Sequence, residues 1–168
     1  WVVVAPYVSP LQPYCDTFVD GNNKSIKDLT MYSSATIAGF LGYCENVEVK
    51  NLTFERATIY STDAYVAPLA YMLDGSYIHG VNVKNSYIRG TSYVAGIAAE
   101  AMDHYDDPDK DYVADFINGV RLKLMPLVTV SDCTTDVNTT IVGTSSIVGG
   151  IVAQGYGCMV IDCHNQAD

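Results

Sequence analysis

The segment between residues 102 and 126 carries the densest charge in the chain. Within it, Asp107, Asp109, Asp111 and Asp115 place carboxylate oxygens at near-alternating positions. Ca²⁺ is a hard cation that takes about six to eight oxygen ligands, and this spacing lets a loop wrap around it. These four aspartates are therefore candidate Ca²⁺ ligands, and the sequence indicates no other cofactor.

The same segment also fits a short helix. Asp111 is a suitable N-cap residue, and Asn118-Gly119 would end the helix. The apolar residues between them fall at helical spacing: Val113, Phe116, Ile117 and Val120. In this interpretation the aspartates lie in a solvated acidic loop, and the helix packs on the flank of the rest of the chain.

Tyrosine is abundant, with 13 copies, and Tyr65 and Tyr93 occupy equivalent places in two similar segments. Stacked, exposed aromatic rings could form a platform for sugar rings or for a protein partner. The alternative is that these rings only shield strand edges or pack under the acidic segment.

No arrangement of residues indicates an active site. His79, His104 and His164 are far apart in sequence, and none has a nucleophile and a base beside it. Polysaccharide lyases and hydrolases need carboxylates converging on one face, whereas the dense carboxylates here lie in one inserted segment. We therefore predict a protein that is not an enzyme.

The net charge of the chain restricts the classes of partner that it can bind. With 9 basic and 19 acidic residues the net charge is −10, which disfavours nucleic acids and anionic lipid headgroups. No stretch approaches the roughly 20 apolar residues that span a bilayer, so we expect no membrane insertion. Cationic partners, Ca²⁺ and neutral glycans remain compatible with this surface.

Internal repeats are the strongest signal for the fold. One block, a β-branched or aromatic residue followed by small and apolar residues, begins at positions 36, 65, 93 and 147. The first two steps between copies are nearly equal, and the third is almost twice as long because it contains the acidic segment. Short β-branched strands repeating at this interval, with Gly, Asn and Asp at corners, predict a coil of stacked strands.

A second block alternates with the first and predicts the core. Its copies place apolar side chains in two columns, at 47, 81, 128 and 158 and at 49, 83, 130 and 160. We expect both columns to point inward, each side chain packing on its equivalent one coil away. The closing residues Asn51, Asn85, Asp132 and Asp162 form a third column, suited to left-handed corners.

These patterns predict an all-β fold: a right-handed parallel β-helix (solenoid) of about five coils in a single domain, 1–168. It comprises a capping segment (1–16), coils (17–101), an inserted loop or short helix (102–126) and further coils (127–168). Because the chain opens within a strand-like run and stops in mid-motif, we expect a piece of a longer array.

Three of the five cysteines fit the predicted core. Cys158 falls in the column of Val47, and Cys133 and Cys163 follow the corner where Leu52 and Ser86 lie. They read as reduced core residues, as free cysteines commonly are. A disulfide between Cys133 and Cys163 is the alternative, since neighbouring coils are within bridging distance. Cys15 and Cys44 are not assigned.

The chain resembles the GLUG-motif repeats of bacterial secreted and surface proteins. The resemblance lies in Phe18-Val19-Asp20-Gly21-Asn22 with Ile26 and Leu29, in the glycine-centred runs 38–42 and 148–152, and in the Asp132-Cys133 and Asp162-Cys163 pairs. It implies a β-solenoid segment of a large exported protein, in a family with often adhesin-like or unassigned roles and no shared catalytic residues.

From the residues and this resemblance we expect a non-catalytic structural or adhesive module at the bacterial cell surface. The alternative is a carbohydrate-binding or polysaccharide-processing β-helix. Expected partners are other domains of the same exported protein, end-to-end copies of this chain, a glycan or a cell-surface protein.

Overall fold

The computed structural model describes residues 14–15, 18–34, 37–62, 64–102, 115–117, 120–122, 128–145 and 147–168. These residues form strands and their connections, and no part of the chain so described is helical. Every strand pairing is parallel except that of β15 with β16. The all-β, parallel arrangement is consistent with the predicted β-helix.

The molecule contains four parallel sheets. The chain adds strands to these sheets in a fixed order and then repeats that order. The β6 sheet contains β22 (Cys158–Ile161), β17 (Val128–Ser131), β10 (Tyr77–His79), β6 (Glu48–Glu55), β11 (Asn82–Lys84), β18 (Thr134–Thr135), β23 (His164–Asn165) and β2 (Phe18–Lys27). The β7 sheet contains β19 (Thr140–Gly143), β12 (Tyr87–Gly90), β7 (Thr58–Ser61) and β3 (Thr30–Ser33).

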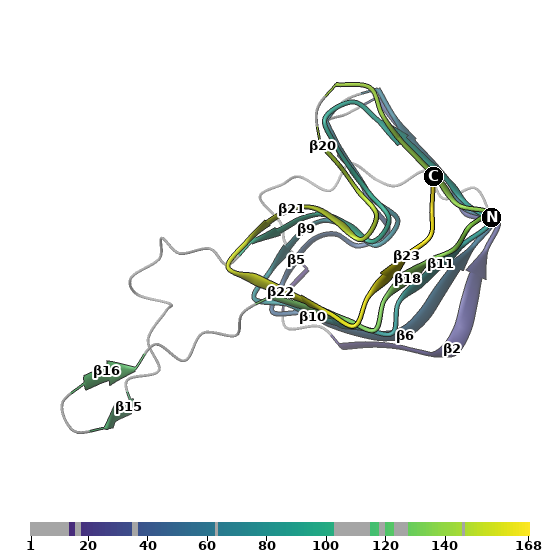
Figure 1. The fold of residues 1–168 in the computed structure, drawn as a ribbon. Coiled ribbons are helices and arrows are strands. Elements are labelled where there is room, and N and C mark those ends of the chain that lie inside the picture. The colour runs from purple at the N-terminus through teal and green to yellow at the C-terminus, as the bar shows by residue number, and fades with distance from the viewer. Residues whose placement is uncertain are drawn as a thin grey trace.

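The other two sheets meet where the chain doubles back, between β20 and β21 in Figure 1. The β8 sheet contains β20 (Ile147–Gly149), β13 (Tyr93–Ala95), β8 (Tyr65–Val66) and β4 (Ile37–Ala38). The β9 sheet contains β1 (Tyr14–Cys15), β5 (Gly42–Glu45), β9 (Ala70–Asp74), β14 (Ala98–Met102) and β21 (Val152–Tyr156). We call one passage through the four sheets a coil.

The strand register gives the length of a coil. Tyr65 pairs with Ile37 on one side and with Tyr93 on the other, so two successive coils have the same length. Tyr93 pairs with Ile147, which lies beyond the acidic segment in the sequence. The predicted alignment of the first block is therefore confirmed at 65, 93 and 147. It is wrong by one residue for the first copy, because Ile37 rather than Thr36 is the partner of Tyr65.

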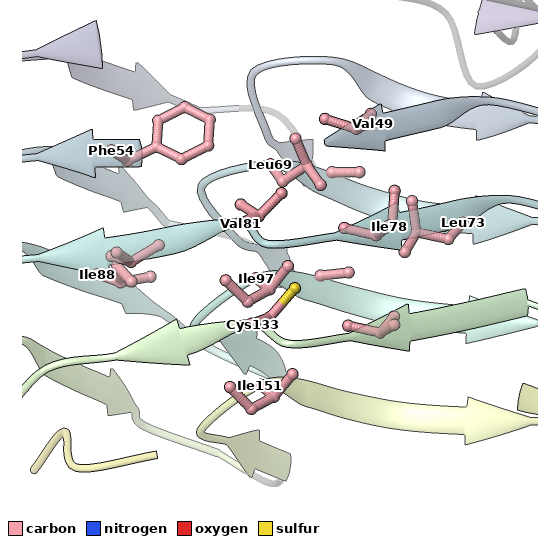
Figure 2. Packing of buried hydrophobic residues seen from close by; sticks show 14 of the residues in the cluster. Val49, Phe54, Leu69, Leu73, Ile78, Val81, Ile88, Ile97, Cys133 and Ile151 are labelled. Carbon is pink, nitrogen blue, oxygen red and sulfur yellow. The ribbon is translucent and has the colours of Figure 1, made fainter. Parts of the chain in front are cut away.

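The predicted valine column is right for three residues and wrong for the fourth. Val130 pairs with Val160 and, through Ile78, with Val49, so these residues stack inward on successive coils. Val83 instead pairs with Phe54, further along β6. The sequence after Gly80 resembles the sequence after Asn46, which is why the two were matched. However, β6 is a long strand, and it pairs with both β10 and β11. Figure 2 shows Ile78 and Val81 among the buried side chains of this core.

The neighbouring column shows the same shift. Val128 pairs with Cys158 as predicted, but Ser76 takes the place of Val81. The buried Ser76 hydroxyl accepts a hydrogen bond from the backbone N–H of Val47 at 3.1 Å, which satisfies a polar group inside the core. Val81 lies one coil from Cys133, whose successor Thr134 donates to the Val81 carbonyl. Val81, rather than Ser86, is thus the equivalent of Cys133.

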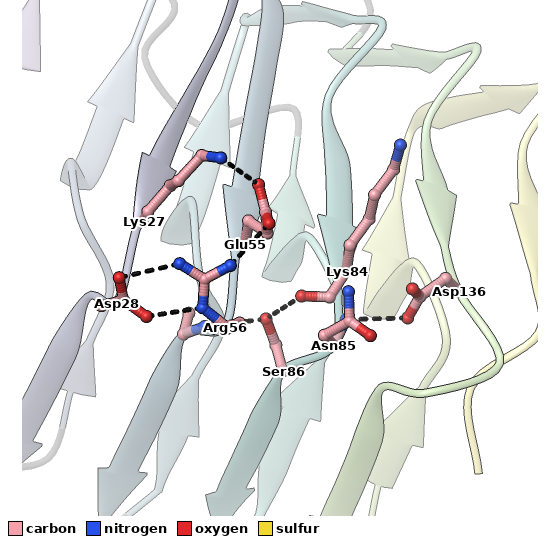
Figure 3. Close-up of polar contacts among 9 residues, drawn as sticks. Lys27, Asp28, Glu55, Arg56, Lys84, Asn85, Ser86 and Asp136 are labelled. Carbon is pink, nitrogen blue, oxygen red and sulfur yellow. Dashed lines mark hydrogen bonds and ion pairs between the residues drawn. The ribbon is translucent and has the colours of Figure 1, made fainter.

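The corner prediction is confirmed in conformation and corrected in register. All four closing residues have left-handed backbone, with φ of 55° for Asn51, 51° for Asn85, 52° for Asp132 and 50° for Asp162. Gly80, with φ of 63°, occupies the Asn51 corner on the next coil. Asn85 belongs to a second corner column with Asp28 and Arg56, shown in Figure 3.

The cysteines that the structure describes with their side chains are reduced. Cys44, Cys133, Cys158 and Cys163 are all free thiols. The backbone N–H of Cys133 approaches the Cys163 sulfur at 3.4 Å, so the two residues are neighbours without a disulfide. Burial raises the pKa of the Cys133 thiol to about 12, which keeps it protonated and unreactive at neutral pH.

The short helix expected in the acidic segment is wrong over the residues described there. Asp115–Ile117 (β15) pairs antiparallel with Val120–Leu122 (β16). Phe, Ile and Val are enriched in strands, so their intrinsic preference opposes the helix that their spacing suggests. The two intervening residues are Asn and Gly, the pair that two-residue hairpin connections favour.

Candidate ligand-binding surface

The β8 sheet brings the two predicted tyrosines together. Tyr65 and Tyr93 open β8 and β13 and are direct partners in the parallel register. Their rings stack with centroids 4.7 Å apart and planes 5° from parallel. The strand spacing of a parallel sheet, about 4.8 Å, imposes this separation on identical side chains in adjacent strands.

The rings lie over a small-residue floor that is separate from the main core. Ala67, Ala95 and Ala99 are fully buried, and both tyrosines pack against them. Because alanine side chains are small, the large tyrosine rings can lie close to the backbone. The rings cover the alanines and are themselves half-buried. The tyrosines therefore do shield part of the sheet.

The surface extends across the bend onto the β9 sheet. The Tyr71 ring lies 6.3 Å from that of Tyr65 and 6.3 Å from that of Tyr43. The Tyr43 hydroxyl donates to a carboxylate oxygen of Asp74 at 3.1 Å. We call Tyr43, Tyr65, Tyr71 and Tyr93 the tyrosine cluster.

A buried carboxyl group lies beside this cluster. Glu100 is only 7% exposed, and burial raises its pKa above the ordinary value for glutamate. Burial also raises the pKa of Tyr65 and of Tyr71, and the nearby Glu100 charge adds to both shifts. Burial and then Asp74 raise the pKa of Tyr43. Tyr43, Tyr65 and Tyr71 therefore stay neutral at physiological pH, and the buried acids Asp74 and Glu100 lie beside them.

Glu100 faces a second acceptor on the next coil. Gln154 is its register partner, and the Gln154 side-chain oxygen Oε1 is buried without a hydrogen-bond partner among the described residues. The Gln154 side-chain nitrogen donates to the Tyr156 hydroxyl at 2.7 Å. The pair thus presents buried acceptors beside aromatic rings.

The geometry limits what the cluster can bind. Because Tyr65 and Tyr93 stack on one another and Ile147 is the register partner of Tyr93 on the next strand, the pair offers ring edges and hydroxyl groups rather than a continuous row of open rings. Hydroxyl groups and acceptors of this kind suit a polyhydroxylated ligand better than an extended apolar one.

Most of the predicted Ca²⁺ ligands lie in a part of the chain that the structure does not describe. Asp107, Asp109 and Asp111 lie outside the described residues, and Asp115 is the first residue of β15. No group of three or more potential metal ligands occurs in the described ranges, which leave out 103–114. His79 contacts both Ser131 and Asp132 through the same ring nitrogen, Nδ1, at 3.0 and 3.2 Å.

Sequence reasoning missed Tyr43, Tyr71, Glu100 and Gln154. A usable signal was present: Glu100 is the single charged residue in the apolar run 97–101, which marks a buried or functional acid. In the strand register, Glu100 pairs with Met72 on the preceding coil and with Gln154 on the following one.

Comparison with known proteins identifies no relative: no family model, no curated protein and no solved structure matches this chain. In the described part of the chain there is no helix of the length and apolarity needed to cross a membrane.

Proposed function

We propose that this chain is a structural and adhesive repeat module of an exported bacterial surface protein, located outside the cell and without catalytic activity. The observation that carries the proposal is the unbroken parallel ladder of its sheets, five strands deep in the β9 sheet. Such a ladder makes a stiff rod whose length scales with the number of coils. The resemblance to GLUG-motif repeats supports the exported setting.

The rod is a right-handed β-helix of about five coils in this proposal, because parallel crossovers are right-handed in nearly all proteins. Its inward columns are apolar and its corners are short, so each coil depends only on its neighbours. This is the property that a spacer or stalk needs, and other domains of the same protein would sit at its ends.

Single-molecule pulling from the two termini tests the structural role. Each unfolding coil should release on the order of 90 Å of chain, since an extended chain spans about 3.3 Å per residue. We expect repeated extension steps of this size at forces well above those that stretch an unfolded chain. Smooth extension without steps would contradict the role as a load-bearing stalk.

Carbohydrate binding is the second candidate function, and the tyrosine cluster favours it. A glycan array with the wild-type chain and the Tyr65→Ala/Tyr93→Ala variant tests this function. The matched control is Tyr32→Ala/Tyr60→Ala, which removes another stacked pair, with centroids 5.3 Å apart, from the β7 sheet. Binding lost only in the first variant supports the site, and binding unchanged by both rules out the cluster as the glycan site.

Calcium binding by the acidic segment is a further proposal, with Asp107, Asp109, Asp111 and Asp115 as ligands. Calorimetric titration of chelator-treated protein tests it against an Asp109→Asn/Asp111→Asn variant. Heat that is released by the wild type and lost in the variant supports the site. Absence of heat and of a thermal shift at millimolar Ca²⁺ would retire it.

A further inference from the structure

Two carboxylate side chains are buried in the described part of the chain, and both lie beside the tyrosine cluster. Asp74 is 8% exposed and Glu100 is 7% exposed. Asp74 accepts a hydrogen bond from the Tyr43 hydroxyl at 3.1 Å, so at least one donor compensates for its burial.

The Glu100 carboxylate has no such partner among the described residues. No described donor forms a hydrogen bond with it, and no described lysine, arginine or histidine forms an ion pair with it. Burial alone raises its pKa, because neither a donor nor a cation opposes the effect. A buried carboxylate without a donor or a cation destabilises the folded state. A group that is costly to the fold is a candidate for a role in binding.

A ligand can reach this carboxylate. Among the described side chains that are not exposed, the only oxygen or nitrogen that is both completely buried and without a partner is Gln154 Oε1. Because Glu100 also lacks a partner, its carboxylate oxygens are not completely buried. They are therefore open to a group that approaches from solvent.

Glu100 occupies an interior position of its sheet. Its strand, β14, lies between β9 and β21, and Glu100 pairs with Met72 on one side and with Gln154 on the other. Its neighbour Ala99 belongs to the small-residue floor under the tyrosine rings. Coils on both sides of β14 therefore fix the place of Glu100 at the tyrosine cluster.

Two tyrosine rings lie next to the Glu100 carboxylate. Burial is the main cause that raises the pKa of Tyr65 and of Tyr71, and the charge of Glu100 is the next largest cause for both. The two rings are 6.3 Å apart, and Tyr93 stacks on Tyr65 at 4.7 Å. Aromatic faces attract cations, most strongly where water is excluded. A carboxylate and aromatic rings together therefore favour a cationic group.

An ammonium group fits this arrangement better than a metal ion does. Hard cations such as Ca²⁺ take about six to eight oxygen ligands, whereas the described ranges hold no group of three or more potential metal ligands. An ammonium group can bind to a single carboxylate and gains from neighbouring aromatic rings. The net charge of −10 also attracts cationic ligands to the chain.

We propose that the tyrosine cluster binds a sugar that carries a free, protonated amino group, with the Glu100 carboxylate as the counter-ion of that group. The inference rests on the carbohydrate-binding function proposed above, in which the hydroxyl groups and ring edges of Tyr65 and Tyr93 contact the sugar. Glu100 makes the site selective for amino sugars over neutral and N-acetylated sugars, because the amino group supplies the cation that the buried carboxylate lacks.

Calorimetric titration of the unmodified chain near neutral pH tests the proposal. The two ligands are a tetrasaccharide of glucosamine and the same tetrasaccharide in its fully N-acetylated form, which keeps the sugar rings and loses the charges. We expect the amino form to bind at least about tenfold more tightly. Equal affinities would overturn the proposal and leave carbohydrate binding intact. Binding of neither ligand would also overturn it, while the glycan array decides separately whether the cluster binds other sugars.

Glu100→Gln keeps the shape of the side chain and removes its charge. It should lower the affinity for the amino form at least about tenfold, with thermal unfolding as the check that the variant is folded. Glu48→Gln is the matched control, because Glu48 also lies between aromatic register partners, Phe18 and Tyr77, but on the β6 sheet. An affinity that falls equally in both variants would refute the role of Glu100. Ethylammonium that binds as tightly as the amino tetrasaccharide would refute the assignment to a sugar.

Discussion

Arg56 binds both carboxylate oxygens of Asp28, through Nε at 2.7 Å and Nη2 at 2.9 Å. The two residues are equivalents on successive coils, and both have left-handed backbone, with φ of 56° and 57°. Arg56 also binds Glu55 at 2.7 Å, and Glu55 in turn pairs with Lys27 at 3.1 Å (Figure 3). Arginine is uncommon in left-handed backbone, and a bidentate ion pair between the two coils stabilises this corner.

Asp28→Asn should lower the melting temperature slightly at neutral pH. The hydrogen bond from Arg56 is the main cause that holds the pKa of Asp28 below its usual 3.8. A depressed carboxyl pKa gives stability that is present above pH 3.8 and is lost as pH falls through the folded-state pKa. The difference between wild type and variant should therefore shrink as the pH falls below 3.8 and vanish once it is below the folded-state pKa of Asp28, as measured by thermal unfolding at several pH values.

Asp162→Asn is the control for this change. It alters a corner aspartate of similar conformation for which the described residues show no ion pair. An equal, pH-dependent loss in both variants would mean that general surface charge, rather than the Asp28–Arg56 pair, is responsible.

Asn46→Ala should cost about 1–2 kcal/mol of unfolding free energy, whereas Asn46→Gly should be nearly neutral. Asn46 is exposed and has φ of 53°, so the alanine Cβ pays the left-handed penalty without losing buried contacts. Urea unfolding of both variants provides the measurement. Equal stability of the alanine and glycine variants would show that the corner relaxes to another conformation.

The parallel stacking of strands could be predicted from the sequence because successive coils of equal length leave similar residues at a fixed interval along the chain. Tyr65, Tyr93 and Ile147 were aligned correctly, and the left-handed corners at Asn51, Asn85, Asp132 and Asp162 follow from what Asn and Asp tolerate. Their conformation is local, so the residue type is enough to predict it.

The register of the second block could not be predicted in the same way. Ser76 and Gly80 stand where other coils carry Val and Asn or Asp, so matching by letters selected Val81 and Asn85. A serine can replace a core valine here because its hydroxyl accepts from the Val47 N–H and donates to the Asp74 carbonyl, and the first of these contacts joins residues 29 positions apart. The tyrosine cluster was half predicted for a similar reason: its Tyr71 and Glu100 meet Tyr65 across a bend between two sheets.

The corrected register can be tested by double-mutant cycles. Val49→Ala and Ile78→Ala remove side chains that stack directly, so their combined loss should depart from additivity by about 0.5 kcal/mol or more. Val49→Ala and Val83→Ala lie in different columns and should add within about 0.5 kcal/mol. Chemical unfolding of the single and double variants measures both cycles. Strong coupling for Val49 with Val83 and none with Ile78 would restore the alignment by sequence letters.

Glu100→Gln should stabilise the protein at neutral pH. Burial raises the Glu100 pKa, so the folded state disfavours the charged form and the carboxylate destabilises folding once the pH exceeds the unfolded value of 4.5. The amide has the same shape, carries no charge and can donate to the unpartnered Gln154 oxygen. Thermal unfolding should show a gain that is largest near pH 7 and disappears below pH 4.5, where the wild-type carboxyl is already neutral in both states. Glu48→Gln, at a half-buried position of β6, is the matched control for the loss of one carboxylate charge. A variant less stable than wild type at neutral pH would mean that the Glu100 charge is compensated by a cation or donor that binds beside the tyrosine cluster.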